Sequence, residues 1–235
     1  MKIPHEEGVA IQGLLASLKA FCFPMGEDAA RQVRRVKITQ RGEICLAPGA
    51  HWTPFTAEQW IDATQSNFCW KARFGGRWFG LFLVIDAFEQ GRGRLVLNLG
   101  GLISLKRFTG PDVDKGEIQR YLGEIVMCPS ILLNHASLEF SASGSRTLRV
   151  RDRKDPSGAT VDFEVSAEGR PVECRAERPR LVGKRAVPTS WSGTCTEFRE
   201  WEGLRVARRV EVSWHLAEAT YTYFRSEVTS FRAWR

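Results

Sequence analysis

The chain has 235 residues, of which 43% are hydrophobic and 26% are charged. This length buries a core without help from disulfides or metal, which excludes a stapled miniprotein. Lys and Arg number 34 against 27 Asp and Glu, so the formal charge is +7. That excess favours weak attraction to anionic surfaces and does not by itself indicate a nucleic-acid partner.

The N-terminal segment predicts no export signal, because Gln12 and Lys19 interrupt its apolar stretch. No window approaches the roughly 18 uninterrupted apolar residues of a transmembrane helix. We therefore expect a soluble, cytoplasmic protein. Its cysteines form no CxxC pair and are expected to be buried small hydrophobes, three disulfides being the alternative if a leader has been removed. These cysteines are Cys22, Cys45, Cys69, Cys128, Cys174 and Cys195.

Periodicity divides the chain into two β-rich halves. Apolar residues at helical spacing from Ile11 to Phe21 predict an N-terminal helix over about 9–22. From about residue 32 the period is two, which predicts a first sheet half over 32–109. Within it, the run 79–88 is apolar on both faces, so we expect a strand that is covered on both sides.

A helical insertion interrupts the strand pattern over about 113–134. Asp114 and Glu117 fit a capping-box-like start, and an apolar stripe follows until Pro129. Alternation then resumes over 136–232 as a second sheet half. Short turns between the strands imply an antiparallel meander. The sequence thus predicts a mainly β (α+β) fold, with a strongly curved sheet of roughly ten strands in a single domain, 1–235.

Strong catalytic signatures are absent from the sequence. There is no P-loop, GxGxxG, GxSxG or HExxH motif, so nucleotide, serine-hydrolase and zinc-protease functions have no support. Histidines occur one at a time, which predicts neither a metal site nor a cofactor.

The insertion carries the densest polar constellation. Glu117, Arg120, Tyr121 and Glu124 fall within two helical turns. Arg120 could hold a ligand carboxylate or phosphate while Glu124 or Glu117 acts as acid or base. The alternative is a solvated helix face with an intrahelical salt bridge. Cys128 near Asn134 and His135 suggests a thiol nucleophile, against which stands a buried core cysteine.

Aromatic and basic residues each allow two interpretations. Eight Trp, 14 Phe and three Tyr on a curved sheet either fill a core or line a ligand cavity. The arginines at 149–153 and 175–185 could attract phosphates, yet acidic residues alternate with them and no recognition helix accompanies them. A solvated sheet face is the favoured interpretation, and no nucleic-acid partner is predicted.

Several segments resemble a family of bacterial proteins known only as a domain of unknown function. The matching segments are 52–59, 68–73, Asp86 with Gly91 and Gly93, 110–112, 116–117, 120–122, Glu124, 129–133, 188–193 and 212–214. This family is more remotely similar to LolA-type lipoprotein carriers. That resemblance implies an unclosed antiparallel half-barrel whose helices lie on the concave side around an apolar cavity. The family pattern often has Pro at position 134, where Asn134 places a polar group beside His135 at the expected cavity mouth.

The first functional hypothesis is a binding protein for an apolar or amphipathic, lipid-like small molecule held between sheet and helices. Arg120 would anchor a polar head. The expected ligand-contacting residues are Trp70, Phe82, Arg120, Tyr121, Leu132, Asn134, Trp191 and Trp214.

The alternative is a cofactor-independent enzyme, such as an isomerase, lyase or hydrolase, in the same cavity. Glu124 or Glu117 would be the base, and Arg120 or His135 would stabilise developing negative charge. A protein-interaction module with an exposed sheet edge is a third possibility. A monomer or a homodimer is compatible with each.

Overall fold

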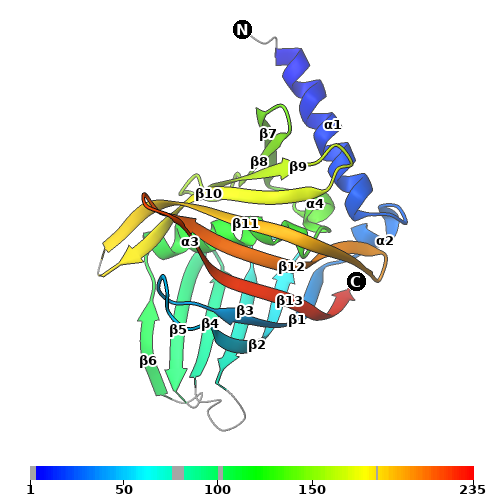
Figure 1. The fold of residues 1–235 in the computed structure, drawn as a ribbon. Coiled ribbons are helices and arrows are strands. Elements are labelled where there is room, and N and C mark those ends of the chain that lie inside the picture. The colour runs from blue at the N-terminus through cyan, green and yellow to red at the C-terminus, as the bar shows by residue number, and fades with distance from the viewer. Residues whose placement is uncertain (1–3, 76–81, 100–102, 184) are drawn as a thin grey trace.

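The computed structural model describes residues 4–75, 82–99, 103–183 and 185–235. Within these ranges it forms one 13-stranded antiparallel sheet (Figure 1). The first six strands are β1 (Arg35–Ile44), β2 (Thr53–Asp62), β3 (Phe68–Phe74), β4 (Phe82–Glu89), β5 (Arg92–Leu99) and β6 (Ile103–Phe108). The others are β7 (Leu138–Gly144), β8 (Thr147–Asp152), β9 (Thr160–Val165), β10 (Pro171–Val182), β11 (Arg185–Trp201), β12 (Leu204–His215) and β13 (Thr220–Trp234).

The sheet is a meander in two runs that meet in its middle. Strands β1 to β6 lead outward to one edge, and β7 to β13 lead inward from the other edge until β13 pairs with β1. The edge strands β6 and β7 do not pair, so the curved sheet stays open. This confirms the predicted half-barrel with its two halves, although thirteen strands replace the expected ten.

Five helical elements accompany the described strands. They are α1 (Pro4–Cys22), α2 (Asp28–Arg31), α3 (Pro111–Gly123), the 3-10 turn η1 (Glu124–Val126) and α4 (Ile131–Asn134). Helix α3 lies in the hollow of the sheet and contacts β4 and β5 of one half and β9 and β10 of the other. The predicted insertion is therefore confirmed. Helix α1 begins earlier than expected. No helix in the described part of the chain is long and apolar enough to cross a membrane.

The core lies between the concave face and α3. On β2, Phe55, Ala57 and Ile61 alternate with more exposed residues, as a half-buried strand requires. The expected two-sided cover of β4 is wrong for its first half, because Phe82 is 42% exposed and only the segment 86–88 is buried. Helix α3 covers only the second half of β4. All six cysteines are free, and five of them are buried, as predicted.

Candidate functional site

The first turn of helix α3 attaches the helix to strand β5 on the concave side of the sheet. The helix starts at Pro111, not at Asp114, whose carboxylate instead accepts a hydrogen bond of 2.7 Å from the backbone N–H of Gly93 on β5. A Cβ at Gly93 would lie 2.7 Å from the carbonyl oxygen of Val113, so only glycine permits this approach. The second half of α3 is consequently buried almost all round.

Arg120 is the centre of a buried charge cluster and does not face solvent. Its guanidinium pairs with Asp86 of β4 and, at 3.2 Å, with Glu124. It also lies 4.9 Å from the ring centre of Phe68 and 5.1 Å from that of Trp70. Burial lowers the pKa of Arg120, but the two carboxylates outweigh it and raise the pKa overall. The solvated-face interpretation is therefore wrong for this helix.

Glu117 is a buried acid beside the same cluster. Burial, and then the neighbouring carboxylate of Asp86, raise the pKa of Glu117 well above its ordinary value. Arg178 and Arg120 oppose this shift without cancelling it. The protonated, neutral form of Glu117 is therefore favoured to higher pH than that of an ordinary glutamate.

Arg178 reaches into the interior from β10. Its residue is 8% exposed, its guanidinium donates to the carbonyl of Gly116 on α3, and it lies 4.8 Å from the ring centre of Trp191. Within the described ranges it has no carboxylate ion-pair partner, and its Nε atom makes no hydrogen bond. A buried cation of this kind is costly unless an anion compensates it.

Aromatic side chains connect the two arginines across the concave face. This aromatic floor consists of Phe55, Trp70, Phe74, Trp191, Trp214, Tyr223 and Phe224. The rings form two contacting groups: in one the centres of Trp70 and Phe224 are 6.2 Å apart, and in the other those of Trp214 and Tyr223 are 5.7 Å apart. The two groups meet at the consecutive residues Tyr223 and Phe224 of β13. The indole N–H of Trp191 donates to the hydroxyl of Tyr223 at 3.1 Å. The floor therefore runs through both sheet halves, with an arginine above each end.

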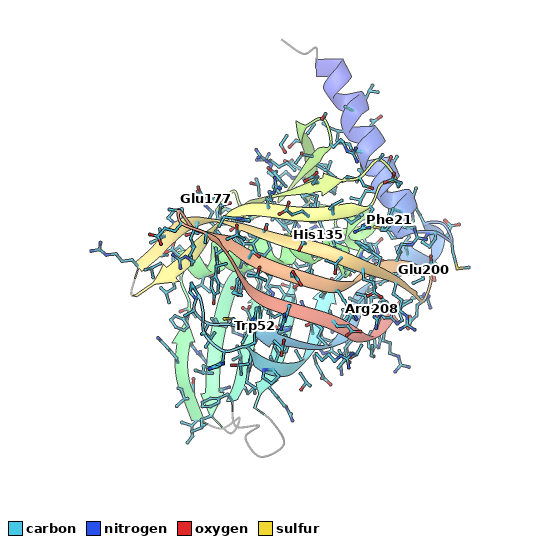
Figure 2. The ribbon with its side chains drawn as sticks, in the orientation of Figure 1. Phe21, Trp52, His135, Glu177, Glu200 and Arg208 are labelled. Atoms are coloured by element: carbon cyan, nitrogen blue, oxygen red, sulfur yellow. The ribbon has the colours of Figure 1, made fainter. Side chains whose placement is uncertain are left out.

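His135, which is labelled in Figure 2, is buried and belongs to a separate hydrogen-bond network. The hydroxyl of Ser66 lies 3.1 Å from its Nε2 and donates to Asp152 at 2.6 Å. Burial lowers the pKa of His135, so the imidazole is neutral. Burial raises the pKa of Asp152, but hydrogen bonds from Ser137 and Ser66 outweigh it and lower the pKa overall. Because Ser66 gives its proton to Asp152, the histidine does not activate it as a nucleophile.

Two predicted ligand contacts have structural partners instead. The amide of Asn134 donates to the carbonyls of Ala30, at 3.2 Å, and Val33, at 2.7 Å, and so ties α4 to the end of α2. The hydroxyl of Tyr121 donates to the carbonyl of Asp62 at 2.9 Å. Neither side chain meets the aromatic floor through these bonds.

We expect Asn134→Ala to lower the free energy of unfolding by about 1–2 kcal/mol, since two partly buried hydrogen bonds are lost. Urea unfolding of the variant measures this. Asn98→Ala on the half-exposed end of β5 is the control, with an expected change within about 0.5 kcal/mol. Equal stabilities of the Asn134 variant and the wild type would show that these bonds contribute nothing.

The sequence was compared with known protein families and with curated proteins. Residues 18–226 match DUF6544, described as a family of unknown function. The chain belongs to the DUF6544 family. Among curated proteins, none matches it in sequence.

Two solved structures resemble the DUF6544 chain. A DUF1329 family protein from Desulfovibrio piger has a TM-score of 0.55 and 8% identity, over 95% of this chain and 93% of that one. A LolA superfamily protein from Nitrosomonas europaea has a TM-score of 0.50 and 11% identity, over 96% and 94%. At such identities the likeness shows the fold alone. The expected resemblance to a domain of unknown function that is remotely LolA-like is confirmed.

The remaining site predictions are spread over the DUF6544 fold. Trp70, Trp191 and Trp214 all belong to the aromatic floor. Leu132 is buried in α4, and Phe82 lies four residues before Asp86, about 13 Å along β4. Burial raises the pKa of the Cys128 thiol, which favours the core-cysteine interpretation over a nucleophile.

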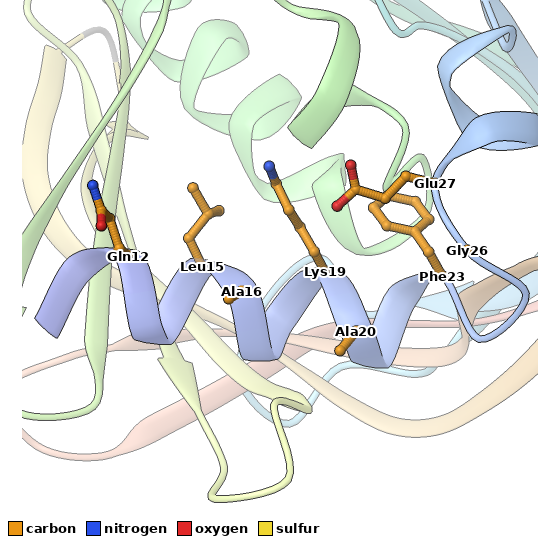
Figure 3. Close-up of a pocket in the computed structure, with 8 residues that line it drawn as sticks. All are labelled: Gln12, Leu15, Ala16, Lys19, Ala20, Phe23, Gly26 and Glu27. Atoms are coloured by element: carbon orange, nitrogen blue, oxygen red, sulfur yellow. The ribbon is translucent and has the colours of Figure 1, made fainter. Parts of the chain in front are cut away.

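Two surface pockets among the described residues of the DUF6544 protein lie outside the charge cluster. One, of about 470 Å³, follows α1 and the turn after it, from Gln12 to Glu27 (Figure 3). The other, of about 410 Å³, lies over β1, β2, β12 and β13 and reaches Phe55 of the aromatic floor. Their locations differ from the expected cavity, which was placed between α3 and the sheet.

Sequence reasoning missed Arg178 and Asp86 as site residues. Arg149 and Arg151 are exposed and pair with acidic neighbours, as a solvated face predicts, but Arg178 points inward. The alternation of side chains along a strand could have indicated this, because residues 175 and 178 are three apart and therefore lie on opposite faces of β10. For Asp86 the signal was a lone carboxylate in an apolar strand, which requires a buried partner.

Proposed function

We propose that the DUF6544 chain binds an amphipathic anion, with its apolar part on the aromatic floor and its charged head at Arg178. The observation that carries this proposal is the buried guanidinium of Arg178 above Trp191, without a carboxylate partner in the described ranges. A ligand carboxylate or phosphate would supply the missing charge through charge-assisted hydrogen bonds. Arg120 is a weaker candidate for this role, because Asp86 and Glu124 already neutralise it.

The fold supports the same class of ligand. The LolA superfamily protein from Nitrosomonas europaea has the same half-barrel, and the resemblance to LolA-type lipoprotein carriers implies an acyl or similarly apolar ligand. Beyond α3, the concave faces of β4 and β5 carry the half-buried residues Val84, Leu97 and Leu99. Apolar surface of this kind suits a hydrocarbon chain.

Binding of a dansyl-labelled undecanoic acid tests the proposal. We expect Arg178→Gln to weaken it about 10- to 100-fold, the value of a buried charge-assisted contact, measured by fluorescence titration. The uncharged methyl ester should bind the variant and the wild type equally well, because it lacks the anion.

Arg175→Gln is the matched control. Arg175 lies on the same strand with a side chain that is 64% exposed, and it should leave both affinities unchanged. Circular dichroism verifies that each variant is folded. If the acid binds Arg178→Gln as tightly as the wild type, Arg178 is not the anchor.

A further inference from the structure

Three hairpin tips lie together at one end of the sheet. The connections β1–β2, β12–β13 and β10–β11 all turn at this end, because antiparallel neighbours in the order β2, β1, β13, β12, β11, β10 align these ends (Figure 1). The backbone N–H of Cys45 donates to the carbonyl of Tyr223 at 2.8 Å, which holds the first two tips side by side.

The β10–β11 tip is apolar on both of its faces. Leu181 is 51% exposed on one face, and on the other Val182 is 46% and Val187 is 42% exposed. A hairpin end that is apolar on both faces cannot bury both against its own core. Figure 1 shows this hairpin projecting beyond the body of the molecule.

The β10–β11 tip is positively charged and the β1–β2 tip is uncharged, whereas the β12–β13 tip carries one exposed acid, Glu218. The segment 178–187 contains arginines and no acidic residue, and Arg185 is exposed. At the β1–β2 tip, the segment 44–54 has no Asp, Glu, Lys or Arg, and its Leu46 is 81% exposed. Exposed aliphatic side chains beside cationic ones match the boundary between acyl chains and anionic headgroups.

We propose that this tip surface, defined as Leu46, Leu181, Val182, Arg185 and Val187, docks on an anionic lipid bilayer. The aliphatic side chains enter the headgroup boundary, and Arg185 contacts lipid phosphates. A protein partner would need a complementary groove for two separate projecting tips, whereas a bilayer accepts both at one plane. This inference stands on the tips alone and does not depend on the ligand proposed for Arg178.

Vesicle co-sedimentation of the full chain tests the docking. We expect at least about fivefold more protein on vesicles with about one third phosphatidylglycerol than on pure phosphatidylcholine, and release at high salt. The double variant Leu181→Asp, Val182→Asp should lower the bound fraction on anionic vesicles about tenfold. Arg185→Glu should also lower the bound fraction on anionic vesicles, although it leaves the aliphatic side chains of the tip unchanged.

The control places the same change on another exposed apolar site. Ile103→Asp with Leu105→Asp alters edge strand β6, where these residues are 60% and 49% exposed, and should bind as the wild type does. The proposal is overturned if the wild type ignores anionic vesicles, if the tip variant binds undiminished, or if the β6 variant loses as much. In the last case, apolar exposure in general, and not this end, governs binding. Since the fatty-acid probe reports on Arg178 separately, either proposal can fail without the other.

Discussion

Arg120→Met is expected to lower the free energy of unfolding by about 3–5 kcal/mol. The substitution keeps the unbranched apolar stem of the side chain but leaves Asp86 and Glu124 without their cation. Both carboxylates are buried, so neither is compensated by water. Urea unfolding measures the loss, provided that the free energy of unfolding falls with urea concentration at the same slope in the variant and the wild type.

Two further variants separate charge pairing from other effects. Adding Asp86→Asn and Glu124→Gln to Arg120→Met should restore much of the loss, because the uncompensated charges are removed. Arg92→Met on β5 breaks an ion pair with Asp114 in the first turn of α3, in which the arginine side chain is 81% exposed, and should cost less than about 1 kcal/mol. A similar loss from both arginines would mean that burial is irrelevant to the Arg120 cluster.

The second large effect is a pH dependence carried by Glu117. Its pKa is raised in the folded chain, so between its ordinary value of 4.5 and the raised value the unfolded chain releases the proton first. Rising pH therefore favours unfolding over this window, and the stability from the neutral acid is lost at about 1.4 kcal/mol per pH unit. Above the raised pKa the loss levels off.

Glu117→Gln mimics the neutral acid and removes this titration. We expect the stability of the variant relative to wild type to rise as the pH increases above about 5, measured by urea unfolding at each pH. Asp86, Arg120 and Arg178 face Glu117 and are retained, and the opposing titration of His135 is common to both proteins and cancels. A difference that does not change with pH would show that Glu117 is ionised in the folded protein.

Sequence patterns predicted the architecture better than the site. The change of period from helix to strand near residue 32, and back at 113–134, located both sheet halves and the insertion, because burial of one face imposes those periods. Helix α2 has only four residues, too few to show any period.

The polar contacts of the site join segments that are distant in sequence. Arg120 was found because its neighbours on α3 form a visible cluster, whereas its strongest partner, Asp86, is on β4 and 34 residues away. The orientation of Arg178 depends on which face of β10 packs against α3. The sequence of β10 shows only that successive side chains point to opposite faces, and it does not show which face is the inner one. Burial of Glu117 and Glu124 likewise depends on the sheet that surrounds α3, which local spacing does not encode.

The pairing of β1 with β13 has a consequence for how the chain acquires its structure. Arg35 and Trp234 are partners in this central seam, although almost 200 residues separate them. Hairpins within each run can form early from neighbours, but the seam closes only when the last strand is available, after a large loss of chain entropy. We infer a high contact order and slow folding, with an unpaired β1 edge exposed on the ribosome until synthesis reaches β13.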